Sequence, residues 1–193
     1  MAVAVFAALL RINAGLSDVA TTTTECFIPS SPRSRSTNSR TSLPRSPIRA
    51  MTLISALVFL ANELLKDTDM TLENRITVVS AIGNHDESTG SPVDVISAAL
   101  IIADKTDVRR SRVRQKERSA FDIHDRVNYA VTDSKLKIAE DKSVIALNLQ
   151  IDENICSMYG YFEIFLERMM FCRKSAEILG TTFKLTANGR KVL

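Results

Sequence analysis

The residues best suited to chemistry lie together at the end of an apolar stretch. His85 is one of only two histidines among the 193 residues, and Asp86 and Glu87 follow it directly in "NHDEST". A chain that otherwise avoids histidine therefore has its first candidate site at residues 85–87.

A fourth candidate, Asp104, lies on the next expected helix. Val93, Ile96, Leu100 and Asp104 follow one another in steps of three, four and four residues, so they share one helical face. An unpaired carboxylate at the edge of a core is too costly to keep. Asp104 is therefore expected to have a cation beside it, which is either a metal ion or an arginine from Arg109, Arg110 or Arg112.

The stretch "VVSAIGNHDESTGSPVDVISAALIIADKTDV", residues 78–108, resembles the later half of bacterial HD-domain proteins, the metal-dependent phosphohydrolase superfamily. In the branch with His-His-Glu and Gly-Tyr-Pro signatures, a helix ends in His-His-Glu, a turn follows, and the next helix carries an Ala-Asp-x-x-Asp motif. The resemblance extends over about residues 55–193. The positions that match or replace the motif residues are His85, Asp86, Glu87, Gly90, Pro92 and Asp104.

The resemblance implies that His85 and Asp104 are metal ligands, with Asp86 and Glu87 as additional site residues. The ion would be Mn, Fe or Mg, bound weakly if at all. It would lower the pKa of a bound water and neutralise phosphate charge, and the substrate would be a nucleotide or another phosphate ester.

The chain departs from the family at the His-Asp dyad, which should lie upstream. No histidine precedes His85, and "NHD" and "IHD" do not stand inside an earlier helix as the dyad does. His124 of "FDIHDRV" is expected to be a hydrogen-bonded structural residue. The chain is therefore expected to be a truncated or degenerate phosphohydrolase. The alternative is a non-catalytic phosphate- or nucleotide-binding regulatory module.

A basic segment, "RRSRVRQKER" at residues 109–118, follows Asp104 closely. Such a run is usually a solvated face. Its arginines Arg109, Arg110 and Arg112 are also candidates for binding substrate phosphates, since guanidinium groups suit bidentate contacts. No aromatic residues are interleaved with them and no nucleic-acid motif accompanies them, so nucleic acid is not an expected partner.

Three helices are expected to position these residues. Apolar residues at helical spacing predict a first helix over "LISALVFLANELLKD", residues 53–67. Thr71 is expected to cap a second helix that ends before "GNHDESTG". "SPVD", residues 91–94, predicts the start of a third helix, with Ser91 as its N-cap and Pro92 at its first position.

The C-terminal part of the sequence predicts strands as well as a helix. "SKLKIAEDKSVIALNLQID" predicts a β-hairpin that turns at residues 140–142. A long helix ending at Gly180 follows, and Asn188-Gly189 predicts the turn of a final hairpin. The expected fold is α+β: a helical HD-like half, then a small antiparallel sheet packed on one long helix. The core stripe expected on that helix comprises Ile155, Tyr159, Phe162, Leu166, Met169, Arg173 and Ala176.

Residues 1–50 differ in composition from the rest. Of the 30 positions from Thr21 to Ala50, 22 are Ser, Thr, Arg or Pro. Six positive and two negative residues among these first 50 account for the excess charge, since the remainder carries 19 positives and 20 negatives. The segment is expected to be a disordered tail or a non-native reading frame, followed by a partial HD-like domain at 51–130 and a C-terminal unit at 131–193.

Other compositional features bear on location and partners. Three cysteines without a recognisable spacing predict no disulfide framework and indicate a reducing, cytoplasmic compartment. The opening "MAVAVFAALL" is too short to span a membrane, so no membrane partner is expected. The sequence is compatible with a homo-oligomer and does not specify the oligomeric state.

Overall fold

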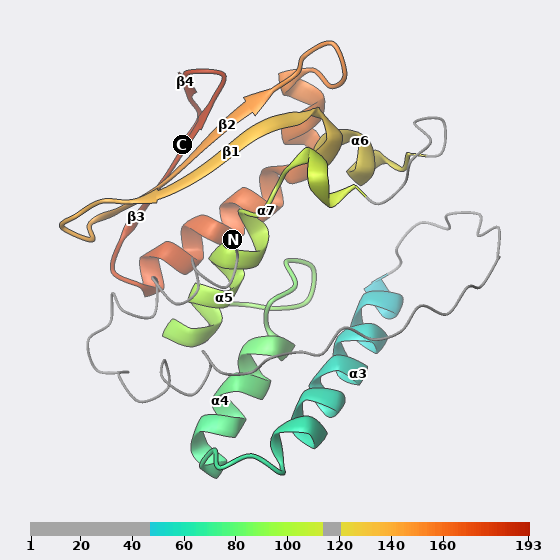
Figure 1. The fold of residues 1–193 in the computed structure, drawn as a ribbon, viewed down its shortest axis with the longest axis vertical. Helices are drawn as coiled ribbons and strands as arrows, with labels where there is room; N and C mark the ends of the chain where they lie inside the picture. Colours follow the sequence, from blue (N-terminus) through green and yellow to red (C-terminus); the bar gives the residue numbers. More distant parts are fainter. Residues whose placement is uncertain (1–46, 114–120) are drawn as a thin grey trace.

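The computed structural model describes residues 47–113 and 121–193, with side chains from residue 51 onward. The expected disorder of residues 1–50 falls almost entirely outside this part of the chain. Helices come first and a four-stranded sheet follows, which confirms the α+β class (Figure 1). The elements are α3 Pro47–Leu65, α4 Leu72–Gly83, α5 Val95–Lys105, the 3-10 turn η1 Arg110–Arg112, α6 Ile123–Ala130, β1 Val131–Ile138, β2 Val144–Ile151, α7 Met158–Ile178, β3 Thr182–Ala187 and β4 Arg190–Lys191.

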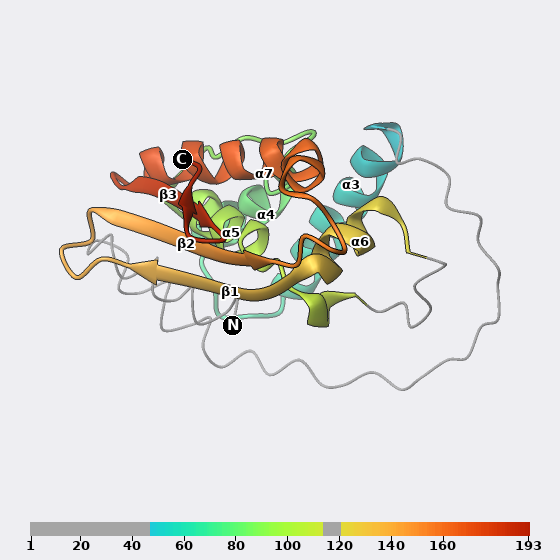
Figure 2. The ribbon, with the colours of Figure 1, turned by 90° about the horizontal axis from the view of Figure 1, so that it is seen from above.

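The helices form successive layers over one face of the sheet. Helix α7 packs on β3, α5 packs on α7, α4 packs on α5, and α3 packs on α4. Figure 2 shows the sheet on one side of α7 and α5, with α3 at the far end of the series. No helix in the described ranges combines the length and apolarity needed to cross a bilayer.

The sheet is mixed, so the expected all-antiparallel arrangement is wrong. Strands β1 and β2 pair antiparallel, as do β3 and β4, but β2 and β3 pair in parallel. The long helix α7 lies between β2 and β3 in the chain and returns it to the end at which β2 began. This is the connection that parallel neighbours require.

The core lies between the sheet and α7. Alternate residues of β2 are buried, and their partners on β3 are buried too: Ile145 pairs with Phe183, and Leu147 pairs with Leu185. The remaining positions of these strands are mostly more exposed. This alternation is typical of a sheet with one face packed and the other facing water.

Two predicted turns are confirmed. The first hairpin turns between β1 and β2 at residues 139–143, as the polar stretch indicated. Asn188 and Gly189 join β3 to β4 with φ values of 48° and 76°. Both positions need the left-handed conformation of a tight hairpin turn, which asparagine and glycine adopt readily. The Asn188 side chain also accepts a bond from Ile151 N at 2.7 Å, which ties the turn to the end of β2.

The start of α5 differs from the expectation. Asp94, and not Ser91, is the N-cap: its side chain accepts from Ser97 N at 2.7 Å, and Ser97 Oγ accepts from Asp94 N at 3.0 Å. Pro92 therefore precedes the helix. By contrast, Thr71 caps α4 as expected, accepting from Asn74 N.

The buried face of α7 also differs from the predicted stripe. Tyr159 is 79% exposed and Leu166 is 48% exposed, whereas Tyr161 and Phe165 are fully buried. Met169 and Ala176 are buried as predicted. The helix is contacted on two sides, by the sheet and by α5, so two adjacent faces are buried instead of the single stripe chosen from spacing.

Candidate functional site

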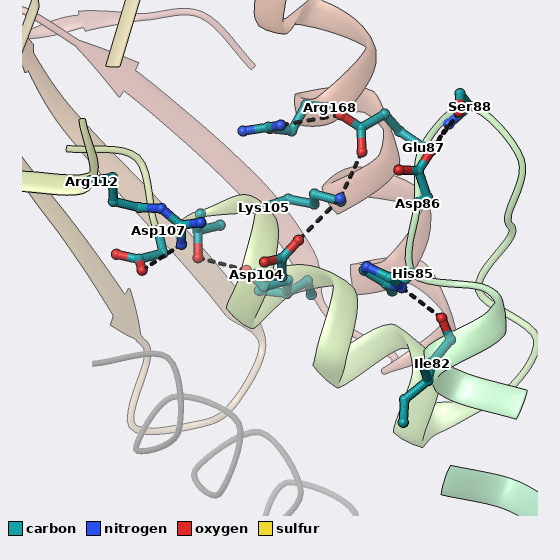
Figure 3. Close-up of polar contacts among 12 residues, drawn as sticks. Ile82, His85, Asp86, Glu87, Ser88, Asp104, Lys105, Asp107, Arg112 and Arg168 are labelled. Atoms are coloured by element: carbon teal, nitrogen blue, oxygen red, sulfur yellow. Dashed lines mark hydrogen bonds and ion pairs between the residues drawn. The ribbon is translucent and has the colours of Figure 1, made fainter. Parts of the chain in front are cut away.

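His85 lies just beyond the end of α4, where its ring is held by the backbone. Its Nδ1 is 2.6 Å from the carbonyl oxygen of Ile82. A carbonyl only accepts, so Nδ1 carries the proton and donates. In the neutral ring Nε2 then keeps its lone pair, which is the arrangement found for histidines that bind metals. In Figure 3 the second ring nitrogen points away from Ile82, toward the side where Asp104 and Lys105 lie.

Asp104 is the second-last residue of α5, and a lysine supplies its cation. Its Oδ2 lies 3.0 Å from Nζ of the neighbouring Lys105. The expectation of an arginine from residues 109–112 is therefore wrong in this structure. A carboxylate has two oxygens, so Asp104 can still bind a further cation beside Lys105.

Lys105 is the centre of a charge cluster made of Glu87, Asp104, Lys105 and Arg168 (Figure 3). Its side chain is only 6% exposed, and Nζ lies 2.7 Å from Oε2 of Glu87. The other oxygen of Glu87, Oε1, lies 3.3 Å from Nε of Arg168 on α7. The cluster thus joins the loop after α4 to α5 and α7, and its two acids balance its two bases.

The electrostatics of Glu87 follow from these contacts. Burial by itself raises the pKa of this carboxyl, but the hydrogen bond and charge of Lys105, helped by the charge of Arg168, outweigh it and lower the pKa to about 2. Glu87 is therefore ionised and already engaged by two cations. Its expected role as an additional metal-site residue does not fit this geometry.

Asp86 stabilises the loop that follows α4. Its Oδ1 accepts from both the backbone N and the hydroxyl of Ser88, and its carbonyl accepts from Gly90 N at 2.8 Å. Gly90 folds back on Asn84 so closely that a Cβ there would come within 2.2 Å of the Asn84 carbonyl oxygen. Only glycine fits this position, and Asp86 shapes the tight loop that carries Glu87 to α5.

The three arginines proposed to bind phosphate have protein partners. Arg109 and Arg112 both pair with Asp107, at 3.0 and 2.9 Å. Arg110 donates from Nε to the Tyr129 carbonyl at 2.8 Å, and its guanidinium lies 4.5 Å from the centre of the Tyr129 ring. These contacts tie the segment after α5 to itself and to α6.

The sequence interpretation missed Lys105 and Arg168. Lys105 had a usable signal: it lies three residues after Ile102 and four after Ile101, both fully buried, so helical spacing places it on the apolar face. A lysine there needs an acid within reach. Arg168 had no comparable signal, because its partner Glu87 is far away in the sequence.

No group of three or more histidine, cysteine, aspartate or glutamate side chains that could hold a metal occurs in residues 51–113 and 121–193. Cys172 lies close enough to the charge cluster for the cluster's charges to influence its pKa. Burial is the largest effect and raises the pKa of the thiol to about 12. The thiol therefore stays protonated at neutral pH while no metal is bound. Within the described residues, His85 and Asp104 thus have no third side chain of these types beside them that could complete an ion's shell.

Two hollows lie on the surface of the described residues. The larger, of about 350 Å³, is lined by Phe121, Arg126, Tyr129 and Ile155 between α6 and the segment before α7. The other, of about 190 Å³, also involves Arg126 and reaches the first turns of α7. His85 and Asp104 line neither hollow, so shape alone does not single out their surroundings as a site.

The ionisation of Glu87 leads to a pH prediction. Its pKa is about 2 in the folded chain against an ordinary 4.5, so its contribution to stability is complete above about pH 4.5 and is lost as the pH falls toward 2. The stability difference between wild type and Glu87→Gln should shrink by roughly 3 kcal/mol over this range. Urea unfolding at several pH values measures it.

The matched control is Glu63→Gln, because Glu63 is ion-paired with Lys66 on the exposed surface of α3. Its effect should stay within about 0.5 kcal/mol at every pH. A Glu87→Gln difference that does not change between pH 5 and 2 would contradict the ion-paired state of Glu87.

Comparisons with known proteins identify no relative: neither protein-family models, nor curated proteins, nor solved structures give a match to this chain.

Proposed function

We propose that this chain is a degenerate HD-type metal-dependent phosphohydrolase that retains a two-ligand half-site, His85 and Asp104, for a divalent ion. The observation that carries the proposal is the bond from His85 Nδ1 to the Ile82 carbonyl at 2.6 Å. This contact sets the tautomer and leaves Nε2 free to bind a cation. The motif resemblance of residues 78–108 supplies the reaction class.

The ion would be Mn, Fe or Mg, and its substrate a nucleotide or another phosphate ester. Bound at such a site, it would lower the pKa of a water and offset phosphate charge. His85 would bind through Nε2, and Asp104 through its carboxylate while keeping its pair with Lys105. Two ligands hold an ion weakly and leave its position poorly defined. Hydrolysis is therefore expected to stay near background.

A second candidate, a non-catalytic phosphate- or nucleotide-binding regulatory module, is favoured by the charge cluster. Lys105 and Arg168 both pair with Glu87, and Lys105 also pairs with Asp104, which makes this part of the surface less attractive to a divalent ion. Arg109, Arg110 and Arg112 would have to leave Asp107 and Tyr129 to bind phosphate. Losing these contacts would cost free energy, and this cost weakens any binding of phosphate by the three arginines.

Manganese binding tests the half-site. Titration calorimetry should show weak binding, and the purified chain should hold well under one equivalent of metal. Both His85→Ala and Asp104→Ala should weaken the affinity at least tenfold, on the order of 1.4 kcal/mol or more. His124→Ala is the matched control, since His124 is half-buried beside the Phe165 ring and should leave affinity unchanged.

Activity separates the two candidates, because a non-catalytic module should show no hydrolysis. Hydrolysis of bis(p-nitrophenyl) phosphate and a nucleotide panel should be small and lost in both half-site variants. Stoichiometric metal and strong hydrolysis that both variants abolish would overturn the degenerate reading. Equal manganese affinity in wild type and His85→Ala would rule out the half-site.

A further inference from the structure

Helix α3 is apolar on more sides than its neighbours cover. From Met51 to Leu65 its only charged residue is Glu63. One side packs on α4, where a methyl of Val58 lies against Gly83. A helix that is hydrophobic all round is normally buried all round. The opposite side of α3 is therefore expected to have a partner.

Four leucines form a continuous row on that side. Leu53, Leu57, Leu60 and Leu64 follow at intervals of four, three and four residues and are 62, 40, 53 and 68% exposed. We call this row the leucine stripe. The spacing is that of helices which pack lengthwise against another helix, each side chain fitting between side chains of the partner. Figure 1 shows α3 beside α4 at the lower edge of the molecule, away from the sheet.

We propose that the leucine stripe is the interface of a homodimer, in which the α3–α4 hairpins of two copies pack together as a four-helix bundle. A row of identical apolar residues is complementary to itself, as a two-fold symmetric interface requires. Glu63 is the one charged residue between Met51 and Leu65, and it is paired with Lys66 at 2.6 Å. The stripe thus offers no charge with which to select an acidic or basic partner.

The apolar surface of the hairpin matches what a dimer needs. Besides the leucine stripe, four large apolar side chains of the hairpin are 58–67% exposed: Met51, Phe59, Leu72 and Ile76. The four leucines of the stripe, at on the order of 100 Å² each, present about 400 Å², and Leu72 and Ile76 of α4 add about 200 Å², which together reach the lower range of what one partner contributes to a specific interface. A bundle in which each helix meets both helices of the other copy can cover most of this surface.

The first test is the mass of the full chain in solution. Sedimentation at about 50 µM, where an interface with Kd near 1 µM is mostly formed, should give twice the 21.3 kDa of one chain. The double variant Leu57→Glu/Leu60→Glu should raise the dissociation constant at least 100-fold and sediment as a monomer. Leu166→Glu on α7, at a position 48% exposed, should remain dimeric and serves as the matched control.

Cross-linking tests the contact without adding charge. In a Cys26→Ser background, Leu60→Cys should form a disulfide between two copies, because Leu60 lies near the middle of the leucine stripe. Leu166→Cys should not. A monomeric wild type would overturn the proposal. The leucine stripe would then either contact another segment of the same chain or face solvent. A dimer that both leucine-stripe variants leave unchanged would place the interface elsewhere and overturn it too. Neither readout depends on metal binding.

Discussion

Replacing Phe165 with alanine is expected to lower the free energy of unfolding by about 3–5 kcal/mol. Phe165 is 1% exposed, and its ring lies 5.3 Å from the Tyr161 ring between α7 and the rest of the core. The Arg168 guanidinium lies 4.5 Å from the centre of the same ring. The substitution therefore removes core volume and also the surface on which Arg168 rests while it pairs with Glu87.

The matched control is Phe162→Ala, one turn earlier on the same helix. Phe162 is only partly buried at the edge of the core, so its loss should cost roughly 1–2 kcal/mol. Spacing alone placed Phe162 in the core stripe and left Phe165 out of it, whereas the structure buries Phe165 more completely than Phe162. Chemical denaturation of both variants decides the order. A larger loss for Phe162→Ala would contradict the observed orientation of α7.

Replacing Lys105 with methionine is expected to destabilise the chain by about 3–5 kcal/mol. Methionine fills a similar volume, so the effect is one of charge. Without the ammonium, Glu87 keeps only Arg168, and Asp104 loses its partner at 3.0 Å. Because burial raises the pKa of Glu87 once Lys105 is gone, part of the loss should disappear when the carboxyl is neutralised.

Two comparisons isolate this effect by thermal or urea unfolding. Lys66→Met removes the lysine of the exposed Glu63 pair and should change stability by less than about 1 kcal/mol. The double variant Lys105→Met/Glu87→Gln should be more stable than Lys105→Met alone. Equal stability of wild type and Lys105→Met would show that the charge cluster contributes nothing net to folding.

Much of the local structure could be read from short stretches of sequence. Thr71 caps α4, the polar residues 140–142 separate two strands, and Asn188-Gly189 turns the last hairpin. Each depends on backbone preferences and hydrogen bonds that span a few residues. The exception is the start of α5, where Ser91 and Pro92 were predicted to begin the helix but the hydrogen bonds with Ser97 make Asp94 the N-cap.

The candidate site was predictable only in part. Helical spacing indicated that Asp104 would have a cation beside it, and it also placed Lys105 on the apolar face of α5, but the interpretation of the sequence did not connect the two neighbours. Glu87 was singled out for its position beside His85, yet its contacts are Lys105 on α5 and Arg168 on α7. Which ion pairs form depends on where the loop after α4 meets both helices.

The sequence by itself determined the fold class and the order of the elements that it predicted, because helical and strand patterns repeat within segments and reflect one buried side each, but it did not predict the short helix α6. Only the tertiary structure decided which residues of α7 are buried, because the sheet and α5 contact it from two directions. It also decided the parallel pairing of β2 with β3, which depends on the return path of α7. It left the leucine stripe of α3 exposed, because α4 covers only one side of a helix that is apolar on both.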